Sequence, residues 1–134
     1  GDQKNNLLNY INKNKLNNIV KLQKRIDNPF PFILKSDAVV LASRFEGLPN
    51  ILLEALSLKK FIISSDCPTG PSEILDRGKG GILFKVGNFV ELSKKIIFLK
   101  KNYKYCLNKK KYAYSRMARF DYKKNLENYY DLFK

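Results

Sequence analysis

Two glutamates, Glu46 and Glu54, flank the start of a predicted helix. Glu46 lies in a turn with Gly47 and Pro49, and Glu54 lies inside the apolar run I-L-L-E-A-L. Burying an unpaired carboxylate costs several kcal/mol, so we expect Glu54 to find hydrogen-bond donors. Carboxylates accept hydrogen bonds from sugar hydroxyls, whereas a helix N-terminus offers free N–H groups to phosphate. The combination suits a sugar nucleotide. Alternatively, Glu46 only complements the helix dipole and Glu54 is a half-exposed helix residue.

The elements that position these carboxylates follow from the apolar pattern of residues 36–71. Residues 38–42 form a β-branched apolar run, which predicts a parallel strand covered on both faces. Residues 51–58 continue the helix that begins near Pro49. Residues 61–64 predict a second buried strand, followed by a polar loop with Thr69 and Gly70. Both strands therefore end at one edge, where open α/β sheets bind ligands.

The run S-R-F-E-G-L-P-N-I-L-L-E-A-L, followed by a strand and S-D-C-P-T-G-P-S-E-I-L, resembles a known family. It is similar to the C-terminal half of retaining glycosyltransferases of family 4, also called glycosyl transferases group 1, which have two-domain GT-B architecture. The family's signature is two glutamates separated by seven residues. The resemblance implies an α/β fold with a Rossmann-like parallel sheet flanked by helices. It also implies that residues 1–134 form one partial donor-binding domain, truncated at its N-terminus, with C-terminal helices over residues 103–134.

The resemblance also implies roles for individual residues. Glu54 would hold the ribose hydroxyls, and Glu46, the candidate catalytic residue, would touch and position the donor sugar. The implied donor-binding residues are Ser43, Arg44, Glu46, Gly47, Leu48, Pro49, Asn50, Glu54, Thr69 and Gly70. The implied base-binding residues are Lys24, Arg25 and Ile26, where family members usually have a glycine. Glu73 is expected to brace the loop beside the donor sugar.

The resemblance implies that the intact protein transfers a hexose or N-acetylhexosamine with retention of configuration. The donor would be a nucleoside-diphosphate sugar, most simply a UDP-sugar, and the acceptor a polysaccharide or lipid-linked glycan of a capsule or lipopolysaccharide. The N-terminal acceptor domain and the first βα unit of this half are missing from the chain, so we expect the fragment to be inactive alone. We expect no cofactor and no metal, since the chain has no Asp-x-Asp motif.

Composition limits the remaining classes. The length of 134 residues suggests one domain, and the absence of histidine excludes a histidine base and ordinary zinc clusters within the chain. Cys67 and Cys106 are expected to be free thiols in a reducing compartment. No apolar run reaches the length of a membrane helix, and no signal-peptide pattern opens the chain. We therefore expect a cytoplasmic location.

The net charge of +14 leaves three interpretations open. Lysines become denser after Lys94, which indicates a solvated surface, an anionic membrane at the inner face of the cell, or nucleic acid. No recognised nucleic-acid motif is present, so we expect no specific nucleic-acid partner. Two other functions also stay open: a sugar-nucleotide epimerase of GT-B fold, and a basic non-catalytic module that binds membranes or nucleic acid.

The flanking elements are predicted as a helix over residues 5–15, a short strand over 19–22, a helix ending at Lys35 and a strand over 82–86. Asn88 is expected to cap a helix whose apolar stripe is Val90, Leu92, Ile96, Ile97 and Leu99. A helix over 105–116 follows. The last helix carries a stripe of Tyr122, Leu126, Tyr129, Tyr130 and Phe133, which would be exposed if the acceptor domain is absent.

Overall fold

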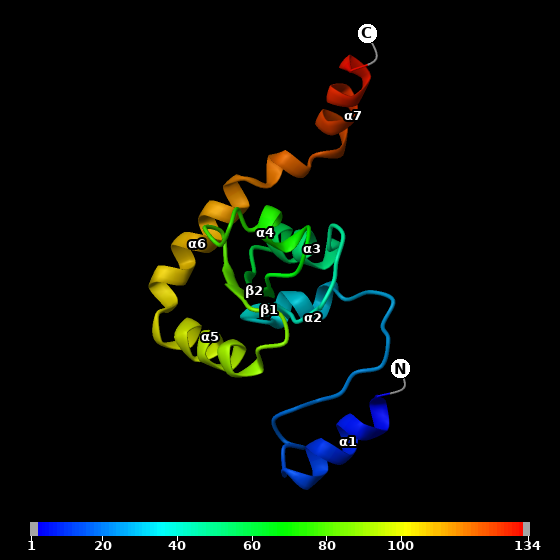
Figure 1. Cartoon of the computed structure of the whole chain (residues 1–134), viewed down its shortest axis with the longest axis vertical. Helices are drawn as coiled ribbons and strands as arrows, with labels where there is room; N and C mark the ends of the chain where they lie inside the picture. The colour runs from blue at the N-terminus through cyan, green and yellow to red at the C-terminus, as the bar shows by residue number, and fades with distance from the viewer. Residues whose placement is uncertain (1–2, 133–134) are drawn as a thin grey trace.

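Three parallel strands form the sheet of the computed structural model, which describes residues 3–132 (Figure 1). They are β1 (Ala38–Leu41), β2 (Phe61–Ser65) and β3 (Ile82–Phe84), in the order β1-β2-β3. Ala38 pairs with Phe61, and Ile63 pairs with Ile82. Since the strands are parallel, their carboxyl ends meet at one edge, and the predicted parallel sheet is confirmed.

Helices cover both faces of the central strand β2, which is buried along its whole length as predicted. On one side Ile62 packs with Leu52 and Leu56 of α3 (Asn50–Ser57) and with Ile74 of α4 (Pro71–Ile74). The opposite side of β2 meets α5 (Phe89–Lys101) and α6 (Tyr103–Ser115). There the core cluster consists of Phe61, Ile63, Ile82, Phe84, Leu99 and Cys106. Alternation of side chains along β2 supplies both layers.

Two predictions about strands are wrong. Residues 19–22 form no strand, because no strand among residues 3–132 lies beside them to accept their hydrogen bonds, and Ile19 is 79% exposed. β1 is not covered on both faces, since Val40 is 43% exposed. In the part of the chain that the structure describes, β1 is an edge strand, which explains this exposure.

The helix α5 begins as the sequence predicts but buries less of its apolar stripe. The Glu91 N–H donates to the Asn88 side chain at 2.9 Å, and the Glu91 carboxylate accepts from the backbone N–H of Lys85 at 3.0 Å. Leu99 is buried and Leu92 is partly buried. Only one side of α5 faces the sheet, so the other three members of the predicted stripe are exposed. They are Val90, Ile96 and Ile97.

The two ends of the chain project from this body in different directions (Figure 1). α1 (Lys4–Lys13) precedes an irregular segment, residues 14–29, and then α2 (Phe30–Lys35), which ends as predicted. At the other end η1 (Met117–Phe120) leads into α7 (Tyr122–Asp131), all of whose side chains are exposed, as expected of the aromatic stripe. Its predicted member Phe133 lies outside the described residues. None of the helices within residues 3–132 is sufficiently long and apolar to cross a bilayer.

Candidate functional site

Two loops meet at the carboxyl edge of the sheet. Residues 42–49 join β1 to α3, and residues 66–70 join β2 to α4. The Thr69 hydroxyl donates to the backbone carbonyl of Glu46. Gly70 has a φ of +73°, and a Cβ there would lie only 2.0 Å from the Gly47 carbonyl oxygen and 2.5 Å from Pro49 Cδ. A glycine is therefore required for the backbones to approach this closely.

A chain of hydroxyl groups fixes the Glu46 carboxylate. The Ser65 hydroxyl, at the buried end of β2, donates to the Ser43 carbonyl at 2.6 Å. The Ser43 hydroxyl in turn donates to Glu46 Oε1 at 2.6 Å. Glu46 is thus held through both its backbone and its side chain. Ser65 was not among the residues predicted from the sequence, although a polar residue at the end of an otherwise apolar buried strand is a signal for it.

Glu54 lies on α3 and is half-buried between apolar neighbours. Ala55 and Leu56 are fully buried against the sheet, and Leu53 packs at the edge of the same cluster. Within residues 3–132 no hydrogen bond or ion pair involves the Glu54 carboxylate. Since the group is partly removed from water yet unpaired, it retains its full capacity to accept hydrogen bonds.

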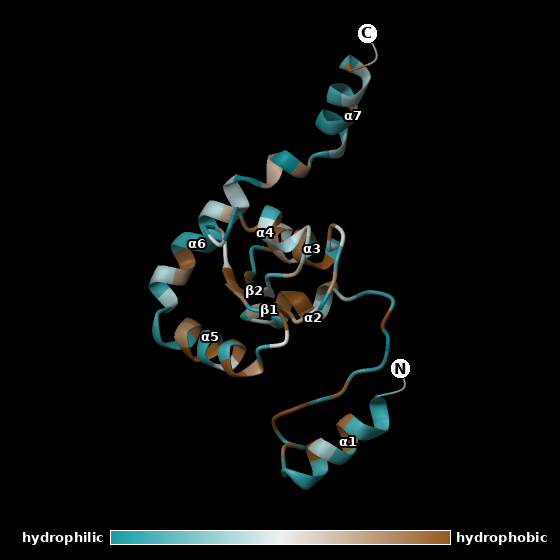
Figure 2. Cartoon of the chain, in the orientation of Figure 1, coloured by the Kyte–Doolittle hydropathy of each residue, from teal (hydrophilic) through white to brown (hydrophobic). Residues whose placement is uncertain are grey.

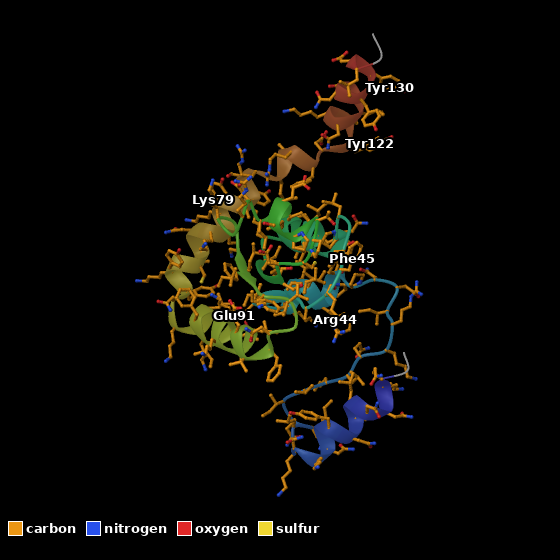
Figure 3. The ribbon with its side chains drawn as sticks, in the orientation of Figure 1. Arg44, Phe45, Lys79, Glu91, Tyr122 and Tyr130 are labelled. Atoms are coloured by element: carbon orange, nitrogen blue, oxygen red, sulfur yellow. The ribbon has the colours of Figure 1, made fainter. Side chains whose placement is uncertain are left out.

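The start of α3 lies beside Glu46 in the chain. Pro49 is buried at the N-cap position, and no side chain caps the helix. The Leu52 N–H donates to the Pro49 carbonyl at 3.0 Å, so within residues 3–132 the N–H groups left open at the start of α3 are those of Asn50 and Ile51. Arg44 and Phe45 lie on the same loop and are exposed, as Figure 3 shows. Gly47, Leu48 and Asn50 are also exposed. The structure therefore brings the predicted donor-binding residues 43–50, 69 and 70 onto one edge.

The predicted base-binding residues lie elsewhere. Lys24 and Arg25 belong to the irregular segment 14–29 and line a hollow of about 540 Å³ with Leu7 of α1 and Leu22. Ile26 follows them and is half-buried. Among the described residues no hydrogen bond or ion pair links these three to the loop of residues 42–49. Glu73 is exposed, and no side-chain contact of the bracing kind is present for it within residues 3–132.

The two groups with shifted pKa values, Asp76 and Cys106, lie at separate structural contacts rather than at this edge. The Tyr112 hydroxyl donates to the Asp76 carboxylate and, with Lys79 3.6 Å away, lowers the pKa of Asp76. This contact ties α6 to the turn after α4. Burial raises the pKa of the Cys106 thiol, and both Cys67 and Cys106 are free, as predicted.

Comparison with known families decides the identity of the fold. The family model described as "Glycosyl transferases group 1" matches residues 1–116. The chain belongs to this family. The matched residues include both loops of the edge and both glutamates, and they end at Arg116, between α6 and η1.

Curated relatives of this glycosyl transferases group 1 chain are much longer than the chain itself. An uncharacterized glycosyltransferase of Methanocaldococcus jannaschii is 51% identical over 75 residues, which are 56% of this chain and 18% of the relative. The lipopolysaccharide 1,6-galactosyltransferase of Escherichia coli is 44% identical over 68 residues, which are 48% of this chain and 19% of the relative. The chain therefore spans about a fifth of the length of these relatives.

Solved structures confirm the fold of the family's C-terminal domain. The C-terminal domain of a glycosyl transferase group 1 family protein from Francisella tularensis has a TM-score of 0.76 and 22% identity, covering 90% of this chain and 63% of that one. A mutant of TarM from S. aureus, in complex with UDP and alpha-GlcNAc-glycerol, has a TM-score of 0.85 and 23% identity, covering 98% of this chain and 27% of that one. The predicted Rossmann-like half of a GT-B glycosyltransferase is confirmed.

Proposed function

We propose that the carboxyl edge of the sheet binds a nucleoside-diphosphate sugar, with UDP as the nucleotide, and that the whole protein transfers the sugar with retention of configuration. The observation that carries the proposal is a pair of carboxylates, one in the loop at the carboxyl edge and one on α3, the helix that begins at that loop. Glu46 is fixed by Ser43, and Glu54 is half-buried without a partner. The fold's likeness to a UDP-bound glycosyltransferase supports the choice of nucleotide.

Each part of the edge has a chemical role in this proposal. Glu54 accepts hydrogen bonds from the ribose hydroxyls, which supply the donors that its surroundings lack. Glu46, oriented by Ser43, accepts from a hydroxyl of the donor sugar and so positions it for transfer. It acts as a positioning group rather than a nucleophile.

The open N–H groups of α3 face the charge that develops on the departing diphosphate. Preorganised donors of this kind stabilise a transition state without reorganising during the reaction. The backbone of residues 47–50, together with Thr69 and Gly70, forms the lining that approaches the sugar and the diphosphate. Arg44, which is exposed on the same loop, supplies a positive charge at the rim.

We assign recognition of the base to Lys24, Arg25 and Ile26. Leu7 and Leu22 give the adjoining hollow apolar walls, which suit a planar ring. Backbone groups of residues 24–26 would then read the edge of the base.

The acceptor is proposed from the relatives. The name of one relative specifies transfer to lipopolysaccharide, so we propose a polysaccharide or lipid-linked glycan as acceptor, and a cytoplasmic reaction at the inner face of the membrane. A second domain, outside this chain, would hold that acceptor. The isolated chain is accordingly expected to bind donor weakly and to transfer no sugar.

The proposal is tested by titrating the chain with UDP and following backbone amide signals by NMR, which detects weak binding. Shifts are expected at residues 24–26, 43–48, 50, 54, 69 and 70. Removing a charged hydrogen-bond acceptor costs about 1.5–3 kcal/mol, so Glu54→Gln is expected to weaken binding about 10- to 100-fold. Glu127→Gln, which removes an exposed acid from α7, is the matched control and should change nothing. Shifts confined to other residues would contradict the proposal.

A further inference from the structure

Residues 92–120 contain no acidic side chain and ten lysines and arginines. This stretch spans most of α5, all of α6 and η1. Within residues 3–132 only Lys95 of this stretch forms an ion pair, at 3.6 Å to Glu91. The excess positive charge of the protein is therefore concentrated on one pair of helices, where it is largely unneutralised.

The outer face of α5 combines this charge with exposed aliphatic side chains. Val90, Lys94, Ile97 and Lys101 follow one another at intervals of four, three and four residues, which places them on one stripe of the helix. Val90 is 49% exposed and Ile97 is 53% exposed. Leu99, on the opposite side, packs into the core. Figure 2 shows α5 as a helix of mixed hydrophobic and hydrophilic residues.

The stripe continues around the turn into α6. The ring of Phe98 on α5 meets the ring of Tyr105 on α6 edge to face, with centroids 6.1 Å apart. Tyr105 is 55% exposed, and Lys104 beside it is exposed. We call Val90, Lys94, Ile97, Lys101, Lys104 and Tyr105 the basic corner.

The part of the basic corner at the turn between α5 and α6 lies away from the candidate donor site. Leu99 and Tyr103, on either side of the turn between α5 and α6, line a small cavity with Asp37 and Phe61, which lie at the start of β1 and β2. The turn and the corner residues nearest to it, Lys101, Lys104 and Tyr105, are therefore at the amino edge of the sheet, whereas Glu46 and Thr69 lie at the carboxyl edge. Figures 1 and 3 share one orientation, in which the turn between α5 and α6 is on the left of the sheet (Figure 1) and Arg44 and Phe45 are to its right (Figure 3).

We propose that the basic corner is a docking surface for an anionic lipid bilayer. Lysines attract anionic headgroups, and aliphatic and tyrosine side chains insert at the boundary between headgroups and acyl chains. Nucleic acid suits the corner less well, because exposed Val90 and Ile97 offer nothing to phosphates or bases. The corner also has lysines only, without the bidentate arginine that favours phosphate recognition.

The test is binding of the chain to phosphatidylcholine vesicles with and without phosphatidylglycerol, measured by sedimentation at low salt. Binding is expected only with phosphatidylglycerol. Each lysine near an anionic surface contributes about fivefold in affinity, so Lys94→Gln with Lys101→Gln should weaken binding roughly thirtyfold. The control is Lys13→Gln with Lys21→Gln, which has the same net charge and should bind nearly as the unchanged chain does.

A second pair of variants separates lipid insertion from charge alone. Ile97→Ser should weaken vesicle binding severalfold, and Ile19→Ser, at an exposed isoleucine outside the corner, should not. The proposal is overturned if anionic vesicles are not bound, if both lysine pairs act equally, or if an oligonucleotide competes through the same two lysines. Since no residue of the corner belongs to the donor site, a parallel UDP titration separates failure of this proposal from failure of the donor site.

Discussion

Gly70 joins the two loops of the edge, and its replacement by alanine tests whether their contact is essential. At φ +73° and ψ −74° Gly70 lies outside the left-handed helical region, and an alanine there costs about 1–3 kcal/mol relative to glycine. Its methyl group would also lie 2.0 Å from the Gly47 carbonyl oxygen, so the loop of residues 42–49 must shift to restore ordinary contact. Overpacking of this kind costs about 1–3 kcal/mol more.

Gly87 provides the matched control, since its φ is +74° and nothing lies within 4 Å of the position of a Cβ. Gly87→Ala therefore carries the backbone cost alone. Urea unfolding followed by circular dichroism should show Gly70→Ala less stable than Gly87→Ala by about 1–3 kcal/mol. NMR of Gly70→Ala should also show displaced amide signals at Glu46 and Gly47. Equal unfolding free energies for the two variants would refute the contact.

Two further perturbations address the hydroxyl chain and the cluster around Asp76. Ser65→Ala should displace the amide signals of Ser43 and Glu46 in NMR spectra, since it removes the hydrogen bond to the Ser43 carbonyl. The control is Ser64→Ala, at an equally buried serine that donates only to the neighbouring Ser65 carbonyl, and it should leave those signals in place. Similar spectra for both variants would contradict the hydroxyl chain. The Tyr112 hydroxyl lowers the pKa of Asp76 in the folded protein. The contact therefore stabilises the fold at pH values above the ordinary aspartate pKa of about 4. This stabilisation is lost as the pH falls through the lower folded-state pKa of Asp76. Thermal melts should show Tyr112→Phe less stable at neutral pH and the difference shrinking below about pH 4; a constant difference would contradict the assignment.

The sequence was sufficient to predict the elements whose residue pattern is compatible with only one kind of secondary structure. Residues 61–63 are a continuous aromatic and β-branched run, which favours a buried strand, and the structure extends the predicted strand 61–64 by one residue to Ser65. The Asn88 cap follows from a local hydrogen bond between Asn88 and Glu91. Such features depend on near neighbours, so spacing alone reveals them.

Features that depend on distant partners were mispredicted or missed. Residues 19–22 have the composition of a strand, but a strand also needs a neighbour, and none lies beside them within residues 3–132. Val40 is exposed for the related reason that β1 is an edge strand there. Ser65 reaches Ser43 across 22 positions of the chain, a contact that no local pattern encodes.

The central claim is that the half-buried Glu54 binds the ribose of a nucleotide. The most direct test is a thermodynamic cycle in which the Glu54 carboxylate and the ribose hydroxyls are removed singly and together. The chain and its Glu54→Gln variant are each titrated by NMR with UDP and with 2′,3′-dideoxy-UDP. Removing the hydroxyls should weaken binding to the unchanged chain about 10- to 100-fold and to the variant less, since a neutral amide oxygen has replaced the charged acceptor there. An equal loss for both proteins would contradict the account, because the ribose hydroxyls would then bind elsewhere.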